Sequence, residues 1–317
     1  MATPQAGIFA LGTRTHHHLE FDVATGASID DVASAVRRLG EPHVAAGGSN
    51  LVVGFGAALW TRLVAAAPSD LADFTEIVGL HEHRAPSTQH DLWIWIHGTG
   101  ADVVLDSALA VSEALAPVLV LADETECFVY HDSRDLTGFI DGTENPPPTE
   151  AFDVALVADG RPGAAGAHVI AQRWVHDLRA FESLDVEAQE HVIGRTKPDS
   201  VALPREVRPV DAHIVRAELL DDAGAERKIY RRSVPYGNVG ERGLYFLAFS
   251  AERERFDGML SRMFGTSGDG VHDHLLDFSR PVTGSYYFAP SIDDLAAIGF
   301  GEARVRQPGD TVAACAE

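Results

Sequence analysis

The sequence predicts an α+β protein made of two similar halves, because the same order of elements occurs twice. A strand-like stretch at 18–23 leads into a helical segment at 30–39, and a strand-like stretch at 244–249 leads into another at 253–264. With 317 residues, the chain is also long enough for two domains of ordinary size.

A proline-rich connection separates the two halves. The segment 137–148 contains two glycines and ends in Pro146-Pro147-Pro148, a run that neither a helix nor a central strand is expected to accommodate. Long irregular connections between compact parts of a protein are unusual and often functional. We therefore expect an N-terminal half over 1–140 and a C-terminal half over 141–317.

Local signals define the individual elements. Residues 18–23 alternate between polar and apolar side chains, the pattern of a half-buried strand. Ser28 stands before Asp30 and Asp31, the pattern of an N-cap followed by acidic residues in the first helical turn, and Gly40 is expected to end that helix. Further strands are expected at 51–55, 92–96, 127–130 and 169–175, and further helices at 101–115 and 184–192.

The composition disfavours several classes of partner. The formal net charge is −22, from 47 acidic and 25 basic residues, and this charge repels nucleic acids and anionic membranes. Cys127 and Cys315 are not a CxxC pair, so they indicate neither a zinc site nor a disulfide framework. The first residues lack the pattern of a secretory signal and no run is long enough to span a bilayer, so we expect a cytoplasmic protein.

The connection contains the stretch Gly138-Phe139-Ile140-Asp141-Gly142, in which two glycines bracket a carboxylate. Glycine permits backbone conformations closed to other residues and the close approach of a ligand. A surface turn, in which Asp-Gly supplies only turn chemistry, explains the same residues. The residues alone leave both interpretations open.

The longer stretch 138–146, GFIDGTENP, resembles the GxxDG signature of the dye-decolorising peroxidases. Segments along nearly the whole chain also resemble landmarks of that family, and the likeness is closest to its compact bacterial B-type branch. These segments are 53–56, 193–197, 234–237 and 244–246. The resemblance implies an α+β fold of two ferredoxin-like halves with antiparallel sheets, within the dimeric α/β-barrel-like superfamily.

The same resemblance implies a function. Members of the family bind haem, so we expect one haem b per chain, held chiefly by the C-terminal half. The expected activity is a peroxidase that reduces hydrogen peroxide and oxidises phenolic or dye-like small molecules through a ferryl intermediate. A homo-oligomer is expected as well.

The resemblance singles out His213, one of 15 histidines, as the iron ligand on the proximal side of the haem. One ring nitrogen would bind iron while the other donates to an acid that fixes the ring. Asp277, flanked by apolar residues, is our candidate for that acid, because a buried carboxylate needs a partner. A solvent-facing aspartate at a helix end is the competing interpretation of Asp277.

Arg231 is expected on the distal side of the haem. If 228–234 forms a strand, Ile229, Arg231 and Ser233 share one face, and an inward guanidinium there requires an anion. The resemblance places the distal arginine at this position. The B-type branch often has asparagine two residues later, where this chain has Ser233, which puts in doubt how tightly a distal water or peroxide is held.

Peroxide cleavage explains why these residue types belong together. A carboxylate such as Asp141 can move a proton between the two peroxide oxygens, and an arginine stabilises the negative charge that develops. Which of Asp141 and Arg231 dominates is left open by the sequence. Arg195 is our candidate partner for a haem propionate, with a surface role as the alternative, and the four tryptophans are interpreted as packing residues.

Three other functions compete with this one. A haem-binding or haem-handling protein without catalysis needs only His213. Chlorite dismutation shares the broad superfamily but should lack the aspartate-containing loop. The glycine-rich segment 46–51 looks like the phosphate-binding turn of a flavin protein, but it lacks the GxGxxG spacing and precedes a strand, so we interpret it as a turn.

Overall fold

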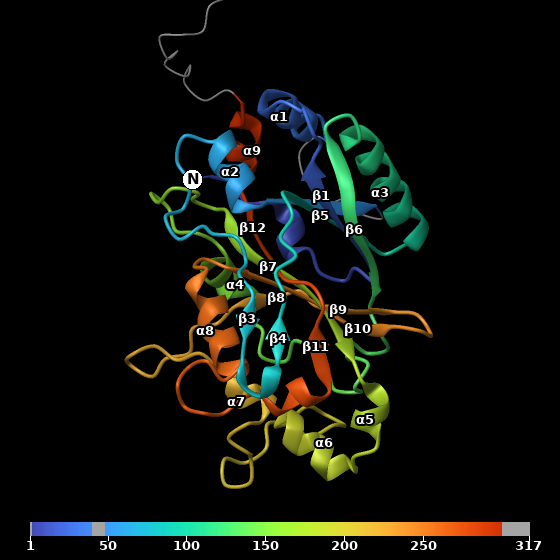
Figure 1. The fold of residues 1–317 in the computed structure, drawn as a ribbon, viewed down its shortest axis with the longest axis vertical. Helices are drawn as coiled ribbons and strands as arrows, with labels where there is room; N and C mark the ends of the chain where they lie inside the picture. The colour runs from blue at the N-terminus through green and yellow to red at the C-terminus, as the bar shows by residue number, and fades with distance from the viewer. Residues whose placement is uncertain (1, 40–47, 300–317) are drawn as a thin grey trace, which may run out of the picture.

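The computed structural model describes residues 2–39 and 48–299. The molecule is elongated, with most of the N-terminal strands and helices in the upper part of Figure 1 and most of the C-terminal ones in the lower part. The predicted end of the first helix at Gly40 and the first two residues of the glycine-rich segment 46–51 lie outside the described residues, while residues 49–51 of that segment belong to a strand. No helix among those described is long and apolar enough to cross a membrane.

Four antiparallel strands form the sheet of the N-terminal half. Their order is β2-β5-β1-β6, in which the first strand of the chain lies between the third and the fourth. With a helix after the first and third strands, this is the βαββαβ arrangement of a ferredoxin-like fold. The elements are β1 (Thr15–Val23), α1 (Ile29–Arg38), β2 (Ser49–Phe55), α2 (Ala57–Leu63), β5 (Leu92–Gly98), α3 (Ala101–Leu115) and β6 (Leu119–Phe128).

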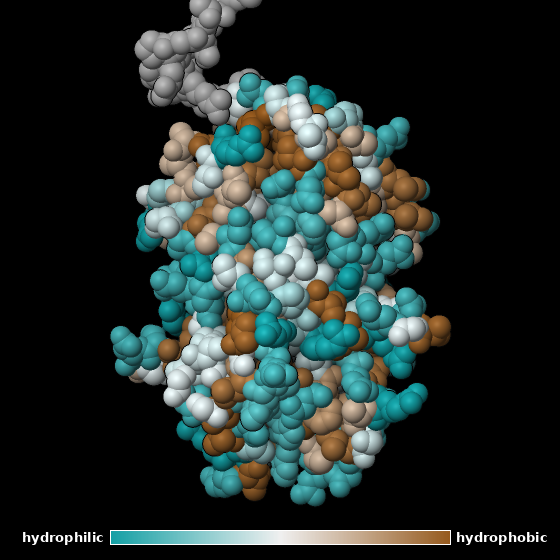
Figure 2. Space-filling view, in the orientation of Figure 1, coloured by the Kyte–Doolittle hydropathy of each residue, from teal (hydrophilic) through white to brown (hydrophobic). Residues whose placement is uncertain are grey.

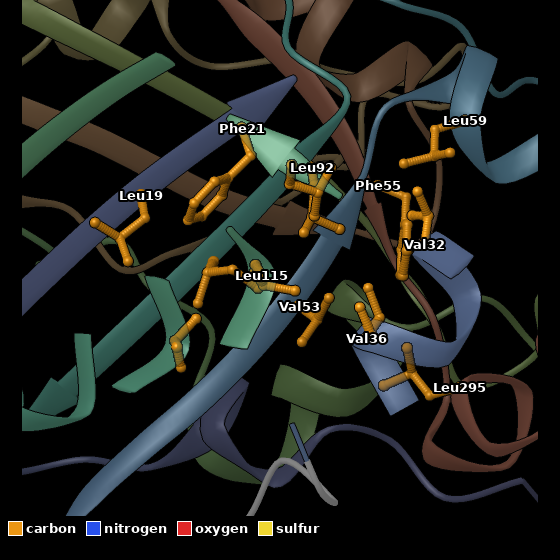
Figure 3. Packing of buried hydrophobic residues seen from close by; sticks show 14 of the residues in the cluster. Leu19, Phe21, Val32, Val36, Val53, Phe55, Leu59, Leu92, Leu115 and Leu295 are labelled. Carbon is orange, nitrogen blue, oxygen red and sulfur yellow. The ribbon is translucent and has the colours of Figure 1, made fainter. Parts of the chain in front are cut away.

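Helices α1 and α3 lie on one face of this sheet, and apolar side chains fill the space between them. Figure 3 shows Phe21 of β1, Val53 of β2 and Leu115 of α3 among these side chains. Helix α1 begins as its sequence predicts, because the Ser28 side chain accepts a hydrogen bond from the Asp31 amide at 3.1 Å.

The C-terminal half has the same strand order, but each of its two edge strands is divided into two shorter ones. Its central strands β7 (Ala167–His176) and β10 (Arg242–Ser250) pair antiparallel. Beside β7, one edge is divided between β11 (Ser279–Pro281) and β12 (Ser285–Ala289). Beside β10, the other edge is divided between β8 (Tyr230–Arg231) and β9 (Val234–Gly237). The helices of this half include α4 (Pro148–Ala155), α5 (Leu178–Glu182), α6 (Val186–Ile193), α7 (His213–Arg216), η3 (His274–Asp277) and α8 (Glu254–Met263).

The two sheets join into one closed ring of strands. Phe288 of β12 pairs with Phe55 of β2, and Cys127 of β6 pairs with Tyr236 of β9. Because β7 also pairs with β10, the eight strands β7-β12-β2-β5-β1-β6-β9-β10 close on themselves. The large antiparallel sheet and the flanking helices confirm the predicted α+β class.

Buried polar groups lie where the two sheets face each other. The carboxylate of Glu20 on β1 accepts hydrogen bonds from the hydroxyls of Tyr245 on β10 and of Ser285 and Tyr287 on β12. Burial raises the pKa of Glu20 above its usual value. Residues from both halves therefore share one interior.

Three local predictions differ from the structure. Only Cys127 and Phe128 of the strand expected at 127–130 are in a strand, and they form the end of β6, which starts at Leu119 and has an exposed outer face. The strand expected over 228–234 is interrupted between β8 and β9. The proline run does enter a helix: Pro148 is the first residue of α4, a position where proline is tolerated because its missing amide would have no helical partner.

The last helix crosses back to the N-terminal half. Leu295 of α9 (Ile292–Ala297) packs with Val32 and Val36 of α1 in the core of Figure 3. The short elements η1 (Ala6–Phe9), β3 (Ile77–Val78), η2 (Leu80–Glu82) and β4 (Arg84–Ala85) complete the fold.

Candidate active site

One cavity of the C-terminal half brings together four of the six predicted site residues. Asp141, Arg231, Ser233 and His213 all line it. They come from the proline-rich connection, from β8 and the break after it, and from the start of α7. The remaining wall is mainly apolar, with Phe139, Ile140, Trp174, Ile193, Ala217, Leu244, Phe246, Met259, Leu260, Met263 and Leu275. Its polar members are Asp135, Thr137, His176 and Ser279.

His213 is fixed from one side by a buried acid. Its Nδ1 lies 2.7 Å from Oδ2 of Asp273, a residue without exposed surface. The other carboxylate oxygen of Asp273 accepts the amide hydrogen of Leu275 at 2.9 Å, so the acid also caps η3. Burial alone would lower the pKa of His213, but the charge and hydrogen bond of Asp273 raise it on balance. The ring orientation is set, and Nε2 remains available as a ligand atom.

Asp277 is not the partner of His213, so that prediction is wrong. Its carboxylate is partly exposed at the end of η3 and faces His83, His272 and His274. Sequence reasoning named Asp277 and did not consider Asp273, which lies four residues before it. The sequence offers Asp273 as a helix cap, but its complete burial is set by tertiary packing.

The segment around Asp141 folds back on itself. The Asp141 amide donates to the carbonyl of Ser133 at 3.0 Å, and the amide of Gly142 donates to Oδ1 of Asp141 at 2.7 Å. Gly138 and Gly142 have φ of 91° and 78°, values that favour glycine. Burial raises the pKa of Asp141 above its usual value, although the charge of Arg231 opposes the increase.

Arg231 is anchored by its backbone and free at its guanidinium. Asn145, in the same segment as Asp141, donates from Nδ2 to the Arg231 carbonyl and accepts the Arg231 amide hydrogen, both at 2.8 Å. The Nε of Arg231 is buried without a hydrogen-bond partner among the described residues. A buried donor on a cation without a partner indicates that an anion or polar ligand belongs beside it.

Ser233 lies in the cavity, but its hydroxyl is engaged elsewhere. The hydroxyl accepts the Leu247 amide hydrogen at 3.3 Å and lies 3.4 Å from the Leu247 carbonyl. These contacts connect the break between β8 and β9 to strand β10. Ser233 therefore contributes more to the course of the backbone than to the polar surface of the cavity.

Arg195 lies beside a second opening that His213 and Arg231 also line. It donates to the carboxylate of Glu144 and to the carbonyl of Ser200. Four other basic residues share this opening with three glutamates, so basic residues predominate there. The four are Arg208, Arg227, Lys228 and Arg255.

Asp141 and Arg231 are also reached through a third opening, of about 430 Å³. Aromatic side chains line it: the ring of Phe9 stacks on Phe152 at 4.1 Å between centroids and on Tyr230 at 5.5 Å. A small molecule that enters here lies against these aromatic rings beside the carboxylate of Asp141 and the guanidinium of Arg231. We call this opening the aromatic approach. The predicted packing role of the tryptophans agrees with their burial.

Comparison with known protein families decides the assignment. Residues 5–129 match the family model "Dyp-type peroxidase, N-terminal", and residues 132–294 match "Dyp-type peroxidase, C-terminal". The chain belongs to the Dyp-type peroxidase family. It is therefore a haem peroxidase, as its resemblance to the family predicted.

Relatives of this Dyp-type peroxidase match it over most of their length. A "Dye-decolorizing peroxidase" of Mycolicibacterium paratuberculosis is 37% identical over 274 residues, which are 84% of this chain and 76% of the relative. Another of Rhodococcus erythropolis is 38% identical over 269 residues, 84% of this chain and 78% of the relative.

Solved structures agree with the fold of this Dyp-type peroxidase. The "dye-decolorizing protein" of V. cholerae has a TM-score of 0.85 at 38% identity, and covers 93% of this chain and 99% of its own. DyPB from Rhodococcus jostii has a TM-score of 0.85 at 35% identity, covering 93% and 98%. A variant of that protein was solved in complex with heme, at 33% identity and a TM-score of 0.84, covering 92% and 97%.

Proposed function

We propose that this Dyp-type peroxidase, as a member of the B-type branch, binds one haem b in the apolar cavity with His213 as the iron ligand. It would use hydrogen peroxide to oxidise phenolic or dye-like small molecules through a ferryl intermediate. The observation that carries the proposal is one cavity lined by an acid-fixed histidine, a carboxylate with a raised pKa and an arginine whose buried Nε has no hydrogen-bond partner among the described residues.

The residues present fit a haem. The cavity wall is mainly apolar, as the faces of a porphyrin require, and His213 offers Nε2 as a ligand atom because Nδ1 is bound to Asp273. The negative propionates would lie at the second opening, where basic residues predominate and Arg195 is our candidate partner together with Arg208. Arg195 already donates to Glu144, so a propionate would have to share or replace that carboxylate.

Haem, when bound, supplies the two electrons that cleavage of the peroxide O–O bond consumes. Asp141 would accept the proton of the inner peroxide oxygen and return it to the outer oxygen, which leaves as water. Its raised pKa brings the carboxylate closer to the range in which a group both accepts and releases a proton readily.

Arg231 would stabilise the negative charge that develops on peroxide during this transfer. Its guanidinium keeps its charge at all relevant pH values and its Nε has no competing partner among the described side chains. Ser233 would contribute little to holding peroxide, since its hydroxyl contacts Leu247. We therefore assign proton transfer to Asp141 and charge stabilisation to Arg231.

The aromatic approach supports small aromatic molecules as reductants. Phe9, Phe152 and Tyr230 form a stacked surface at the opening that leads to Asp141. Planar phenols and dyes gain most from stacking on such a surface. This opening also gives hydrogen peroxide a route to the same carboxylate.

We further propose a cytoplasmic homo-oligomer whose chain divides into halves 1–140 and 141–317, with the second half holding most of the haem. Figure 2 shows apolar residues gathered over α3, where Val103, Leu105 and Leu109 are exposed. Such a patch is typical of a surface that pairs with another protein. Light scattering of the haem-loaded protein tests self-association, and a single-chain mass would contradict it.

An absorption spectrum before and after one equivalent of hydrogen peroxide tests the proposed function. We expect a Soret band from histidine-ligated haem that changes on mixing and returns when a phenol or dye is added and oxidised. A haem-handling protein without catalysis would show the band but no peroxide-dependent change. Absence of any haem band after loading would contradict the cofactor itself.

A further inference from the structure

A second group of potential ligands lies away from the proposed haem cavity. His83, between η2 and β4, faces His272 and Asp277 of the segment that follows α8. Each of these three residues has a ligand atom within 4.8 Å of those of the other two. The segments are held against each other by the backbone, because the Leu80 amide donates to the carbonyl of Phe264 at 2.9 Å.

The distances within the group match a tetrahedral metal site. Oδ1 of Asp277 lies 3.2 Å from Nε2 of His83 and 3.4 Å from Nε2 of His272. Two ligand atoms on one tetrahedral zinc ion, at the usual bond lengths, lie about 3.3 Å apart. The two separations from the carboxylate to the imidazoles are therefore those that a shared ion imposes, and the two imidazoles have ligand atoms within 4.8 Å of each other.

Hydrogen bonding explains only part of the arrangement: Nε2 of His272 is hydrogen-bonded to Oδ1 of Asp277 at 3.4 Å, whereas His83 has no such bond. The Nε2 atom of His83 is buried, and it forms no hydrogen bond of acceptable geometry with any described residue in spite of its 3.2 Å approach to Asp277. A buried, unpartnered imidazole nitrogen that faces a carboxylate is what a metal ligand looks like without its ion.

We propose that His83, His272 and Asp277 bind a divalent first-row transition metal ion, with zinc as the representative. Two imidazole nitrogens and a carboxylate oxygen are ligands that zinc prefers, and a tetrahedral ion needs one further ligand. Water can fill the fourth position. A nearby imidazole is the alternative, since the ring of His81 lies 4.9 Å from that of His272 between centroids.

The ion would connect the two halves of the protein next to the haem ligand. His83 belongs to the part that matches the N-terminal family model, whereas His272 and Asp277 belong to the C-terminal part. The two C-terminal ligands flank Asp273, whose carboxylate fixes His213. The bound metal would thus hold the segment that carries Asp273 in place, in a structural rather than a catalytic role.

Zinc titration of the haem-loaded protein tests this inference. After treatment with a chelator, the protein is incubated with zinc, dialysed, and analysed for zinc and iron. We expect one zinc for each haem iron and a higher melting temperature with zinc than without, because binding to the folded state stabilises it. A zinc-to-iron ratio close to zero would overturn the proposal.

Variants locate the site. His83→Ala, His272→Ala and Asp277→Asn should each weaken zinc binding by roughly tenfold or more, since each removes a direct ligand. His191→Ala on α6 is the matched control and should bind zinc like the unaltered protein. Asp277→Asn is conservative and partly exposed, so it keeps the test valid if a histidine variant does not fold. Equal zinc binding by Asp277→Asn and the control would place the ion elsewhere and overturn the assignment.

Discussion

Asn145 pairs with both backbone polar groups of Arg231. Its side-chain amide donates to the Arg231 carbonyl and accepts the Arg231 amide hydrogen, each at 2.8 Å. The residue that follows the GxxDG motif by three positions thus attaches the segment of Asp141 to the strand of Arg231. This contact explains how a proline-rich connection positions a carboxylate beside a guanidinium from another part of the chain.

Replacing Asn145 by alanine should therefore disturb Arg231. Two backbone groups lose their partners, at a cost of about 1–3 kcal/mol for each one that stays buried and unsatisfied. We expect a lower melting temperature and a slower reaction of the haem-loaded protein with peroxide. Asn145→Asp keeps the acceptor but loses the donor. Its melting temperature and its rate of reaction with peroxide should lie between those of the unaltered protein and of Asn145→Ala. Unaltered stability and rate in Asn145→Ala would show that other contacts position Arg231.

The His213 assignment predicts a specific loss in His213→Ala. The other imidazole of the cavity, His176, has its two ring nitrogens engaged by Ser279 and Asp135, so stable haem ligation should disappear in this variant while the fold survives. The Soret band after haem loading and the far-ultraviolet circular dichroism spectrum measure the two properties. A native Soret band with histidine-ligated iron in this variant would refute the assignment.

Asp273 and Asp277 give a matched pair for the role of the acid behind His213. Asp273→Asn keeps a possible acceptor for Nδ1 but removes the charge, which weakens the imidazole as a donor and raises the Fe(III)/Fe(II) potential. A tenfold change in this one-electron equilibrium corresponds to about 59 mV. In zinc-free protein, Asp277→Asn should leave the potential unchanged. A raised potential in Asp277→Asn but not in Asp273→Asn would show that Asp277, and not Asp273, is the acid behind His213.

Asp135 should make stability depend on pH. Burial would raise its pKa, but the nearby His176 and the hydrogen bonds from His176 and Thr137 lower it on balance, well below the usual value. A lowered pKa contributes stability above the unfolded-state pKa of about 3.9, and this contribution is lost as the pH falls through the folded-state value.

Asp135→Asn should consequently destabilise the protein near neutral pH, by about 1.5–3 kcal/mol if the charged hydrogen bonds are lost. The difference from the unaltered protein should shrink as the pH falls below 4. Urea unfolding at several pH values measures it. A difference that is constant over the whole pH range would mean that the charge of Asp135 does not matter.

Periodic and locally capped elements could be predicted from the sequence. The helix at 101–115 was predicted with the bounds that the structure has, and the N-cap at Ser28 was identified by the acids that follow it. Both depend on neighbours within one turn, so the sequence contains the needed information. The pairing of edge strands depends on residues far apart in the sequence, which is why the break between β8 and β9 was missed.

The site residues that the family resemblance identifies could be predicted from the sequence. The partners that the tertiary fold brings next to them could not. Asp141, Arg231 and His213 do line one cavity. The acid behind His213 was misassigned because two aspartates flank the same short turn, and only tertiary packing buries Asp273 and leaves Asp277 exposed. The contact between Asn145 and Arg231 spans 86 positions, and no local pattern indicates it.

The rate at which peroxide changes the haem spectrum, measured by stopped flow across pH, tests the central claim most directly. Burial raises the pKa of Asp141, and only its deprotonated form accepts a proton, so the rate of the unaltered protein should fall as the pH drops through that pKa.

Arg231→Leu should be slower at every pH at which the protein stays folded. Asp141→Ala should lose roughly a hundredfold to ten-thousandfold in rate, less if water compensates, and should no longer show the acidic titration. An Asp141→Ala variant with the unaltered rate and the unaltered pH profile would contradict the account, because Asp141 would then transfer no proton.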